Sequence, residues 1–326
     1  MPRKTYDAEY DKKLKEYFDA SLPEKIYDAH FHISRRYTKN SGYQGEPFSQ
    51  YTEYMENSLG RKISGGLVMP PTGIDPYEVF MDEKAYTLSV ARENNLDVGL
   101  LVKPGCGKEN TVKTIQKNPE IKALKPYMNY SVKENFTEAD ILDYAPEWMW
   151  EIADEREMPV VIHLSHYQDM LSAPQNISQL RYISKKYKRA KIILAHCAMG
   201  HHVHKLKLGL SEISDLENIW VDCSGSAEAM SIYYCLKTFG VNRMMYGGDY
   251  NAAEVQGRIC SIGSNFIGIY DGYLKEDVIP GAFKYQPISF GEECLLALLQ
   301  ASEILDLKEN DMEKIFYNNA IELFMR

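Results

Sequence analysis

The run KIYDAHFHI at residues 25–33 sets the pattern that decides the fold. It is short and mostly apolar, and seven further runs of this kind follow it, each bounded by turn-forming or polar residues. Those seven are GGLVMPP (65–71), LDVGLLVKP (96–104), IKALKPYM (121–128), MPVVIHLSH (158–166), KIILAHCAM (191–199), NIWVDCSG (218–225) and NRMMYGGDY (242–250). We therefore expect eight β-strands.

The stretches between these runs have helical patterns. Residues 75–95 form one example, and residues 137–157 form another in which Pro146 predicts a kink or a break. Strands that alternate with helices pair in parallel through right-handed crossovers, and eight such units close into a barrel. We predict an α/β fold, a (β/α)8 TIM barrel, with an open doubly wound sheet as the structural alternative.

Nothing in the composition marks a domain boundary, so residues 1–326 are expected to form a single barrel domain. Two pieces lie outside the eightfold pattern. An N-terminal extension, residues 1–24, contains a predicted helix at 7–20 whose apolar face would cover the bottom of the barrel. A long loop insertion, residues 251–290, follows strand eight, and loops of that length usually serve function or an interface.

The charge and cysteine content exclude several classes of protein. The net charge of −9 argues against nucleic acid or an anionic membrane as a partner held by bulk electrostatics. The six cysteines show no disulfide framework, which favours a reducing compartment. The N-terminus is too charged for a signal peptide, and no later run reaches transmembrane length. We expect a cytoplasmic protein.

The first run ends in a pair of histidines, His30 and His32. Because strand side chains alternate between two faces, Ile26, Asp28, His30 and His32 are expected to share one face. Two histidines separated by a single residue often occur by chance. Their position gives them weight, because barrel enzymes place catalytic groups at the C-terminal ends of strands.

Three further residues end candidate strands: His163 on strand five, His196 on strand six and Asp249 on strand eight. Alternation puts each on the same face as the residues two and four positions before it. Gly247 would then leave space one layer below the Asp249 carboxylate. A single histidine is most often a packed core residue, but packing explains poorly why four of them, with a carboxylate, end the strands.

Three neutral imidazoles and one carboxylate can hold Zn²⁺ or a similar divalent ion with room for water. Such an ion would lower the pKa of water and supply hydroxide near neutral pH. The remaining histidine and the aspartate could then orient or deprotonate the nucleophile.

The sequence D-A-H-x-H on strand one, with histidines on strands five and six and aspartate on strand eight, resembles the amidohydrolase superfamily. It is most similar to the amidohydrolase-2 branch of mononuclear hydrolases and decarboxylases. PVVIH, KIILAHC and the tail KIFYNNAIELF (314–324) carry the same resemblance, which runs from about residue 25 to the C-terminus.

The resemblance implies a role for each matching residue. The implied ligands of one divalent metal ion, Zn²⁺ or alternatively Mn²⁺, are His30, His32, His163 and Asp249. His196, which would contact water or substrate, and Asp249 are the implied catalytic residues, and Asp28 matches a supporting acidic position. The chain departs from the usual pattern after His196, where Cys197 replaces a frequent glycine, and after Asp249, where Tyr-Asn replaces Tyr-Pro.

Three cations are candidates for substrate binding: Lys125, Arg35 and Arg36. Lys125 competes with Lys122 for the inward position on strand four, where binuclear relatives carry a carboxylated lysine that bridges two metals. We favour a substrate or supporting role over a bridge. Arg35 and Arg36 follow His32 directly, and either guanidinium could hold a substrate carboxylate in bidentate fashion. A solvated basic turn explains them equally well.

The sequence therefore predicts a hydrolase that attacks a lactone, an amide or a related small carbonyl compound with metal-activated water. The alternatives are a non-oxidative decarboxylase of a small carboxylic acid and a metal-free barrel that binds a small molecule. Metal content after purification without added metal separates the last from the others. The expected partner is a small-molecule substrate, with neither nucleic acid nor membrane, and the 251–290 segment is a candidate interface for a homo-oligomer.

Overall fold

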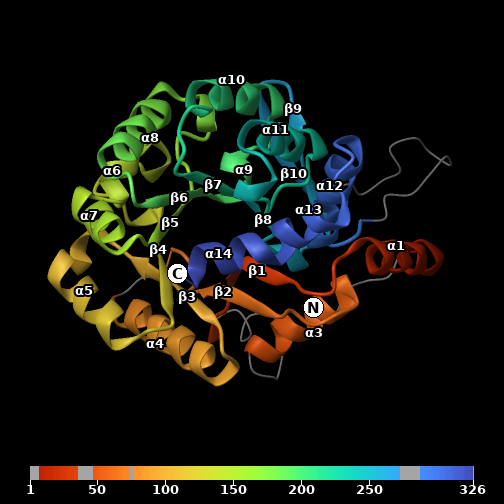
Figure 1. Ribbon diagram of the computed structural model, residues 1–326, viewed down its shortest axis with the longest axis horizontal. Coiled ribbons are helices and arrows are strands. Elements are labelled where there is room, and N and C mark those ends of the chain that lie inside the picture. The colour runs from red at the N-terminus through yellow and green to blue at the C-terminus, as the bar shows by residue number, and fades with distance from the viewer. Residues whose placement is uncertain (1–6, 36–46, 74–76, 272–286, 326) are drawn as a thin grey trace.

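A computed structural model describes residues 7–35, 47–73, 77–271 and 287–325, and it confirms the predicted barrel (Figure 1). Eight parallel strands follow one another in chain order, each hydrogen-bonded to the next. They are β1 (Tyr27–His32), β2 (Gly65–Met69), β3 (Asp97–Val102), β4 (Ile121–Pro126), β5 (Pro159–Ile162), β6 (Lys191–Leu194), β7 (Ile219–Asp222) and β8 (Met244–Met245). The chain beyond β8 returns to β1, where Asp249 N donates to His30 O at 2.8 Å, so the barrel is nearly closed.

Helices follow the strands along the chain, and most of these helices flank the outside of the barrel. They are α1 (Ala8–Ser21), α3 (Pro47–Leu59), α4 (Tyr77–Asn94), α5 (Lys108–Lys117), α6 (Ile141–Tyr144), α7 (Glu147–Arg156), α8 (Pro174–Lys186), α9 (Ala195–Met199), α10 (Val203–Ile213), α11 (Ala229–Phe239), α12 (Phe290–Ile304), α13 (Glu309–Glu313) and α14 (Asn319–Phe324). The predicted break at Pro146 is confirmed, because this residue is the N-cap of α7 and separates it from α6. In the part of the chain that is described, no helix has the length and apolar character needed to cross a bilayer.

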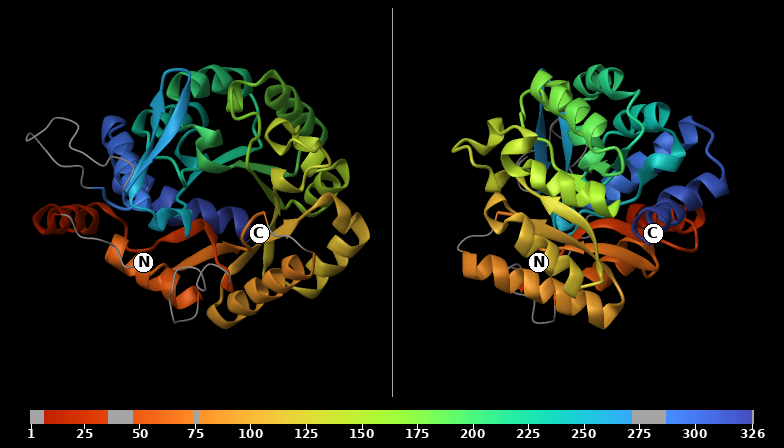
Figure 2. Two further views of the ribbon diagram at one scale, coloured as in Figure 1. Left: turned by 180° about the vertical axis from the view of Figure 1, so that it is seen from behind. Right: turned by 60° about the vertical axis from the view of Figure 1, so that its left-hand side comes forward.

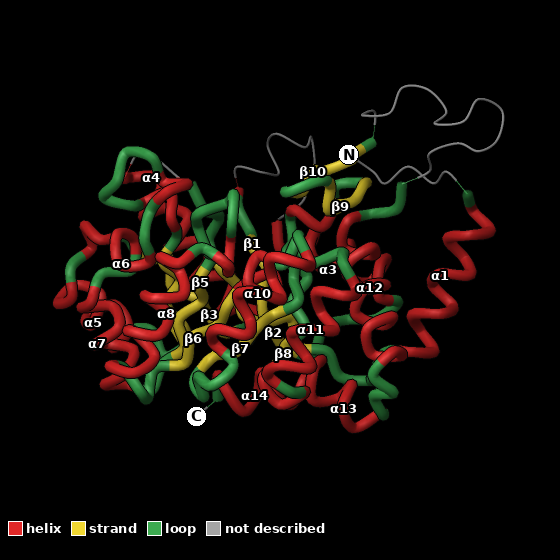
Figure 3. The backbone as a smooth tube through the Cα atoms, turned by 90° about the horizontal axis from the view of Figure 1, so that it is seen from above, coloured by secondary structure: helices red, strands yellow, loops and turns green. Residues whose placement is uncertain are grey.

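The inside of the barrel is packed with small and medium apolar side chains, one from each of several strands. They include Ala29, Leu67, Ala123, Val161, Ile193 and Met245. The C-terminal helix α14 closes the end of this interior core, with the Phe324 ring stacked on Tyr27 at 5.8 Å between centroids. Figure 3 shows α14 at one end of the barrel, opposite β9 and β10.

The N-terminal helix does not cover the bottom of the barrel, and that prediction is wrong. Leu14 and Phe18 of α1 are buried as expected, but Tyr10 is 48% exposed. Helix α1 packs along α3 and reaches α12, where the Tyr17 hydroxyl donates to Glu303 at 2.5 Å. The helix therefore extends the outer wall, and α14 takes the place at the bottom.

Strand β1 contains a β-bulge, because its register with β2 shifts between Asp28 and Phe31. Both of these residues contact Tyr51 of α3: the Tyr51 hydroxyl donates to Asp28 at 2.9 Å, and its ring stacks on Phe31 at 4.1 Å. A bulge adds one residue to a strand and so interrupts the alternation of faces. The prediction that Asp28 and His30 share a face is therefore wrong, since Asp28 turns toward α3 and His30 toward the other histidines.

The 251–290 segment is not a plain loop. It contains a short turn, Ala252–Glu254, followed by an antiparallel hairpin of β9 (Gly257–Ile262) and β10 (Asn265–Tyr270). Residues 272–286 of this predicted insertion lie outside the described residues. The hairpin crosses the loops at the C-terminal mouth of the barrel (Figure 2, left), and it is hydrogen-bonded to segments that follow β5, β6 and β7.

Candidate metal centre

Three of the predicted residues meet at the mouth of the barrel: His30, His196 and Asp249. One ligand-type atom of each lies within 4.8 Å of those of the other two. His30 Nε2 is 3.9 Å from Asp249 Oδ1, and His196 Nδ1 is 3.8 Å from Asp249 Oδ2. Residues on or just after strands one, six and eight, far apart in sequence, thus form one group in which both histidines are buried and Asp249 is partly exposed.

His32 and His163 lie on either side of this group without belonging to it. The His32 ring is 5.3 Å from that of His30, and the His163 ring is 5.1 Å from that of His196. Main-chain carbonyl oxygens accept hydrogen bonds from their Nδ1 atoms, Pro70 O at 2.8 Å from His32 and Leu164 O at 3.2 Å from His163. Because a carbonyl only accepts, Nδ1 carries the proton in each, and Nε2 keeps its lone pair.

His30 is oriented by a carboxylate that sequence reasoning missed, Asp222 at the end of β7. Its Oδ2 accepts from His30 Nδ1 at 3.0 Å, and its Oδ1 accepts from the main-chain nitrogens of His196 and Ser224, each at 3.1 Å. Carboxylates that hold the far nitrogen of a histidine are typical of metal sites. The signal in the sequence was an aspartate at the end of the apolar run NIWVDCSG. The structure shows this aspartate fully buried.

A left-handed turn brings His196 into the group. The predicted neighbours of its face, Ile192 and Leu194, pack outside the barrel, whereas Ile193 and Ala195 pack inside. Alternation alone would therefore turn His196 outward. His196 and the three residues after it have φ values of 50 to 59°, and this turn redirects the imidazole toward the mouth. Such angles are rare outside glycine and cluster at functional sites.

Two glycines make room for the group. A Cβ atom on Gly247 would lie 2.9 Å from His30 Cβ and 3.0 Å from Ser224 Cβ, and one on Gly248 would lie 2.7 Å from Asp28 Oδ2. The space at Gly247 is thus taken up by His30 and Ser224. No side chain fits at either position unless the neighbouring residues move.

Asp28 is fully buried and connects β1 to the chain beyond β8. Its carboxylate accepts hydrogen bonds from Gly248 N at 2.8 Å, His30 N at 3.0 Å and Tyr51 Oη at 2.9 Å. Burial raises its pKa to about 7, although these three bonds act in the opposite direction. Asp28 therefore fixes the backbone on which His30 sits, without belonging to the tight group.

Burial dominates the electrostatics of the cluster. It lowers the pKa of His32 to about 4 and that of His163 to about 3, and it holds the pKa of His30 and of His196 well below the usual range. It raises the pKa of Asp249 to about 8, with the nearby Asp222 charge as a further cause. Neutral imidazoles beside carboxylates in a largely buried site are the donor set that a divalent cation stabilises.

Lys125 points into the barrel and Lys122 does not take that position, which settles the competition between them. Lys125 follows the interior residue Ala123 by two positions on β4 and is fully buried, whereas Lys122 is only partly buried. Its Nζ atom has no hydrogen-bond partner among the described residues and lies 5.7 Å from the centre of the Tyr127 ring. Burial lowers the Lys125 pKa to about 8, against the attraction of Asp222 and Asp249.

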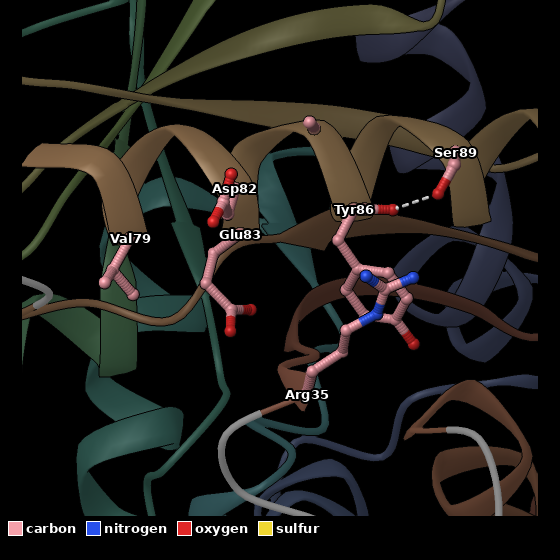
Figure 4. A pocket seen from close by; sticks show the side chains of 7 residues that line it. Arg35, Val79, Asp82, Glu83, Tyr86 and Ser89 are labelled. Atoms are coloured by element: carbon pink, nitrogen blue, oxygen red, sulfur yellow. Dashed lines mark hydrogen bonds between the residues drawn. The ribbon is translucent and has the colours of Figure 1, made fainter.

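Arg35 lies in a different place from the one predicted. Its guanidinium packs 4.3 Å from the centre of the Tyr86 ring on α4, in a pocket of about 560 Å³ (Figure 4). Asp82 and Glu83 of the same helix line that pocket, and none of the histidines or aspartates of the cluster does. The second predicted cation, Arg36, lies outside the described residues.

The protein is a (β/α)8 barrel with buried histidines and a carboxylate at its mouth. Comparison with known proteins identifies its family. The family model for amidohydrolases, of the amidohydrolase-2 type, matches residues 132–326. This chain belongs to the amidohydrolase-2 family. No curated protein matches it by sequence.

Solved structures share the fold at low sequence identity. One is a Pseudomonas putida protein assigned as a 2-pyrone-4,6-dicarboxylic acid hydrolase, with 14% identity over 93% of this chain and 98% of that chain and a TM-score of 0.55. A zinc-bound amidohydrolase from Burkholderia multivorans shows 10% identity over 92% and 99%, with a TM-score of 0.60. A 2,6-dihydroxybenzoate decarboxylase complexed with 2,6-dihydroxybenzoate shows 10% identity over 93% of this chain and 100% of that chain, with a TM-score of 0.53.

Proposed function

We propose that this protein is a metal-dependent hydrolase of a small polar carbonyl compound, such as a lactone or an amide. The observation that carries the proposal is the buried cluster at the barrel mouth, where neutral imidazoles from three strands surround the Asp249 carboxylate. The family and the zinc-bound neighbour of the same fold support it. The proposed setting is the cytoplasm.

The residues that would hold one divalent cation, Zn²⁺ or alternatively Mn²⁺, are His30, His32, His163 and Asp249. In each of the three histidines Nδ1 is already hydrogen-bonded, so Nε2 is the atom left to bind. His196 belongs to the tight geometric group, but we assign it another role. Its Nδ1 atom, which lies nearest Asp249, is engaged by the Ser224 carbonyl at 3.0 Å. A bound ion would lower the pKa of water and polarise the substrate carbonyl.

The chain supplies the proton transfers. Asp249 would accept the proton of the attacking water, because a cation beside it restores its ionised form. His196 donates from Nδ1 to Ser224, so its Nε2 atom is free to accept a hydrogen bond from water or substrate. Water adds its oxygen to the carbonyl carbon, the carbon–oxygen or carbon–nitrogen bond breaks, and the proton passes to the leaving group.

Lys125 is the proposed substrate-binding cation, and it also supports the second candidate function. A buried ammonium with no partner would gain from a substrate carboxylate, and a decarboxylase needs such a cation beside its metal. One neighbour of the same fold is a decarboxylase. Hydrolysis stays the first choice because Arg35, the other described candidate cation, packs on Tyr86.

The deciding experiment assays purified, zinc-loaded protein against lactones, amides and unsaturated or aromatic carboxylic acids. We expect a hydrolytic product whose new oxygen comes from ¹⁸O-labelled water. Release of CO₂ from an acid, with no hydrolysis across the panel, would replace hydrolase with decarboxylase. Protein that binds no divalent metal would instead indicate a barrel that only binds a small molecule.

Lys125→Met tests the substrate-binding cation separately. We expect full metal content and a fall in kcat/KM of roughly tenfold or more, because a hydrogen bond to a charged group contributes about 1.5–3 kcal/mol. Loss of metal from this variant would show that the lysine helps to hold metal. The proposed partners are the small-molecule substrate and a second copy of the chain, without nucleic acid or membrane, and light scattering measures the oligomeric state.

A further inference from the structure

The loop after β5 is held in one conformation by hydrogen bonds from its own side chains. His166 donates from its main-chain nitrogen to Thr137 O at 2.7 Å, and its Nε2 atom lies 3.1 Å from Asp140 Oδ1. The neighbouring Ser165 hydroxyl donates to Ala139 O. The loop is therefore tied to the segment that precedes α6.

A second set of bonds closes the other side of the loop. Asn176 Nδ2 donates to Ser165 O at 3.0 Å and to Met170 O at 2.8 Å. His166 and Met170 have φ values of 57° and 52°, which side-chain-bearing residues seldom adopt. The surrounding contacts must maintain this shape, as is common where a loop positions a functional side chain.

This loop places Tyr167 against His163. The two ring centroids are 6.1 Å apart with the planes at 66°, and Tyr127 packs on the same imidazole at 5.0 Å. A third tyrosine in contact with His163, Tyr144, donates its hydroxyl to the His163 carbonyl at 3.0 Å. The Tyr167 hydroxyl, in contrast, bonds to no other residue in the described part of the chain, and its side chain is partly exposed.

We infer that the Tyr167 hydroxyl is a substrate-binding hydrogen-bond donor, directed at the oxygen on which negative charge develops during carbonyl attack. The inference rests on the proposed hydrolytic function. A loop held by several hydrogen bonds packs the Tyr167 ring on a proposed metal ligand, and among the described residues the hydroxyl of that ring has no partner. This is the character of a preorganised donor, whose contribution to catalysis is large because the donor needs no reorganisation.

The test uses phenylphosphonate, a tetrahedral anion that resembles the adduct of water and a carbonyl group. Its dissociation constant is measured by calorimetry on zinc-loaded wild type, Tyr167→Phe and the control Tyr182→Phe. Tyr182 lies on α8, is 42% exposed and bonds to Glu147 through its hydroxyl, so it reports the effect of losing a remote hydroxyl. We expect Tyr167→Phe to raise Kd by roughly tenfold or more, since 1.4 kcal/mol is tenfold and bonds to charged groups are worth at least that. The control should match wild type.

Each other outcome overturns the inference in its own way. Equal Kd values for Tyr167→Phe and wild type, at equal zinc content, would remove Tyr167 from the site and leave the proposed hydrolase intact. Loss of zinc from Tyr167→Phe would make the residue a support of His163 instead of a donor to substrate. No phosphonate binding to zinc-loaded wild type would overturn the inference together with the hydrolytic site on which it rests.

Discussion

The imidazoles of His30, His32 and His163 are each oriented through a hydrogen bond at Nδ1. The Asp222 carboxylate accepts a hydrogen bond from Nδ1 of His30. Main-chain carbonyls accept hydrogen bonds from Nδ1 of His32 and from Nδ1 of His163. A neutral histidine has one donor and one acceptor nitrogen, so fixing the donor also fixes where the lone pair points. The lone pairs are set before any ligand arrives.

Asp222→Asn should lower the affinity for Zn²⁺ by about 10- to 100-fold, as loss of such hydrogen-bond partners typically does. The amide can still contact His30 but cannot strengthen its basicity as a carboxylate does. Competition with a chelator of known affinity measures the change. Asp215→Asn is the control, because that exposed carboxylate bonds only to surface groups of Arg181. Equal zinc affinity of wild type and Asp222→Asn would contradict the role assigned to Asp222.

His163→Ala and His196→Ala should differ in kind. His163→Ala is expected to lose most bound metal, whereas His196→Ala should keep most of it and lose most turnover, because His196 is assigned to contact water or substrate and not to hold the ion. Metal analysis after dialysis gives the comparison. The assignment of ligands is reversed if His196→Ala loses more metal than His163→Ala.

Sequence reasoning found the five residues at the mouth because position at a strand end is a local property. It missed Asp222, since an aspartate at the end of a strand looks like an ordinary polar residue until its partner, His30 on a strand far away in sequence, is known. It could not place Arg35, because the direction of that side chain depends on Tyr86 in the next helix. The roles of the five residues stay predictions.

At the scale of elements, the strands were predictable and their inward faces were not. Every strand of the barrel falls inside its predicted run, because a fully buried parallel strand is an apolar run whichever way it faces. The strands β9 and β10 lie in the segment that was predicted to be a loop. Because a fully buried strand is apolar on both faces, its sequence does not show which residues alternate inward and outward. On β1 a bulge moves Asp28 outward, and after β6 a left-handed turn brings His196 inward. Neither irregularity has a glycine or a proline to announce it.

Gly247→Ala should damage the site through backbone packing alone. The added Cβ atom would approach His30 Cβ and Ser224 Cβ to within 3.0 Å, so we expect a loss of roughly 1–3 kcal/mol in unfolding free energy and weaker zinc binding. Urea denaturation and a zinc titration measure both. Gly105→Ala is the matched control, because a Cβ atom there meets nothing within 4 Å. Zinc binding as tight in Gly247→Ala as in the control would contradict the expected clash.

At the scale of the whole molecule, the barrel buries Asp28, Asp222 and Asp249 at one end while carrying a net charge of −9. Its surface does not supply a compensating positive field. Lys125 is a buried cation near Asp222 and Asp249, but burial also disfavours its charged form. The free energy of folding should therefore depend on both pH and divalent metal.

Without metal, the contribution of Asp28 and Asp249 to stability should fall as the pH rises from about 7 to 8. The folded pKa values of Asp28 and Asp249 are raised to about 7 and about 8, so the folded state holds protons that the unfolded state, with an ordinary pKa near 4, has released. Each such proton lowers the unfolding free energy by about 1.4 kcal/mol per pH unit. The buried histidines and Lys125, whose pKa values are lowered by burial, act in the opposite direction, because the unfolded state binds more protons at these residues than the folded state does. The contribution of the carboxylates is therefore measured as a difference between wild type and a variant.

Urea denaturation at several pH values, with chelator and with saturating zinc, measures this dependence. Zinc should remove the part of the fall that comes from Asp249, because the ion binds the ionised carboxylate. Without metal, wild type should lose more unfolding free energy between about pH 7 and 8 than the variant Asp249→Asn does, because the variant has no proton to release at this position. An equal change in the two proteins over that range would contradict the expectation.

The β9–β10 hairpin has a consequence for how this protein can acquire new activities. Barrel enzymes usually diversify by altering the loops at the mouth one at a time, which is why one scaffold serves many chemistries. Here Asn265 bonds to Gln168 after β5, Ser261 to His201 after β6, and Arg258 to Ala227 after β7. An insertion in any one of those loops must be accommodated by the ribbon and hence by the others. During evolution of this enzyme, the hairpin and the three loops that it contacts should therefore change together, so that their sequences vary jointly between relatives.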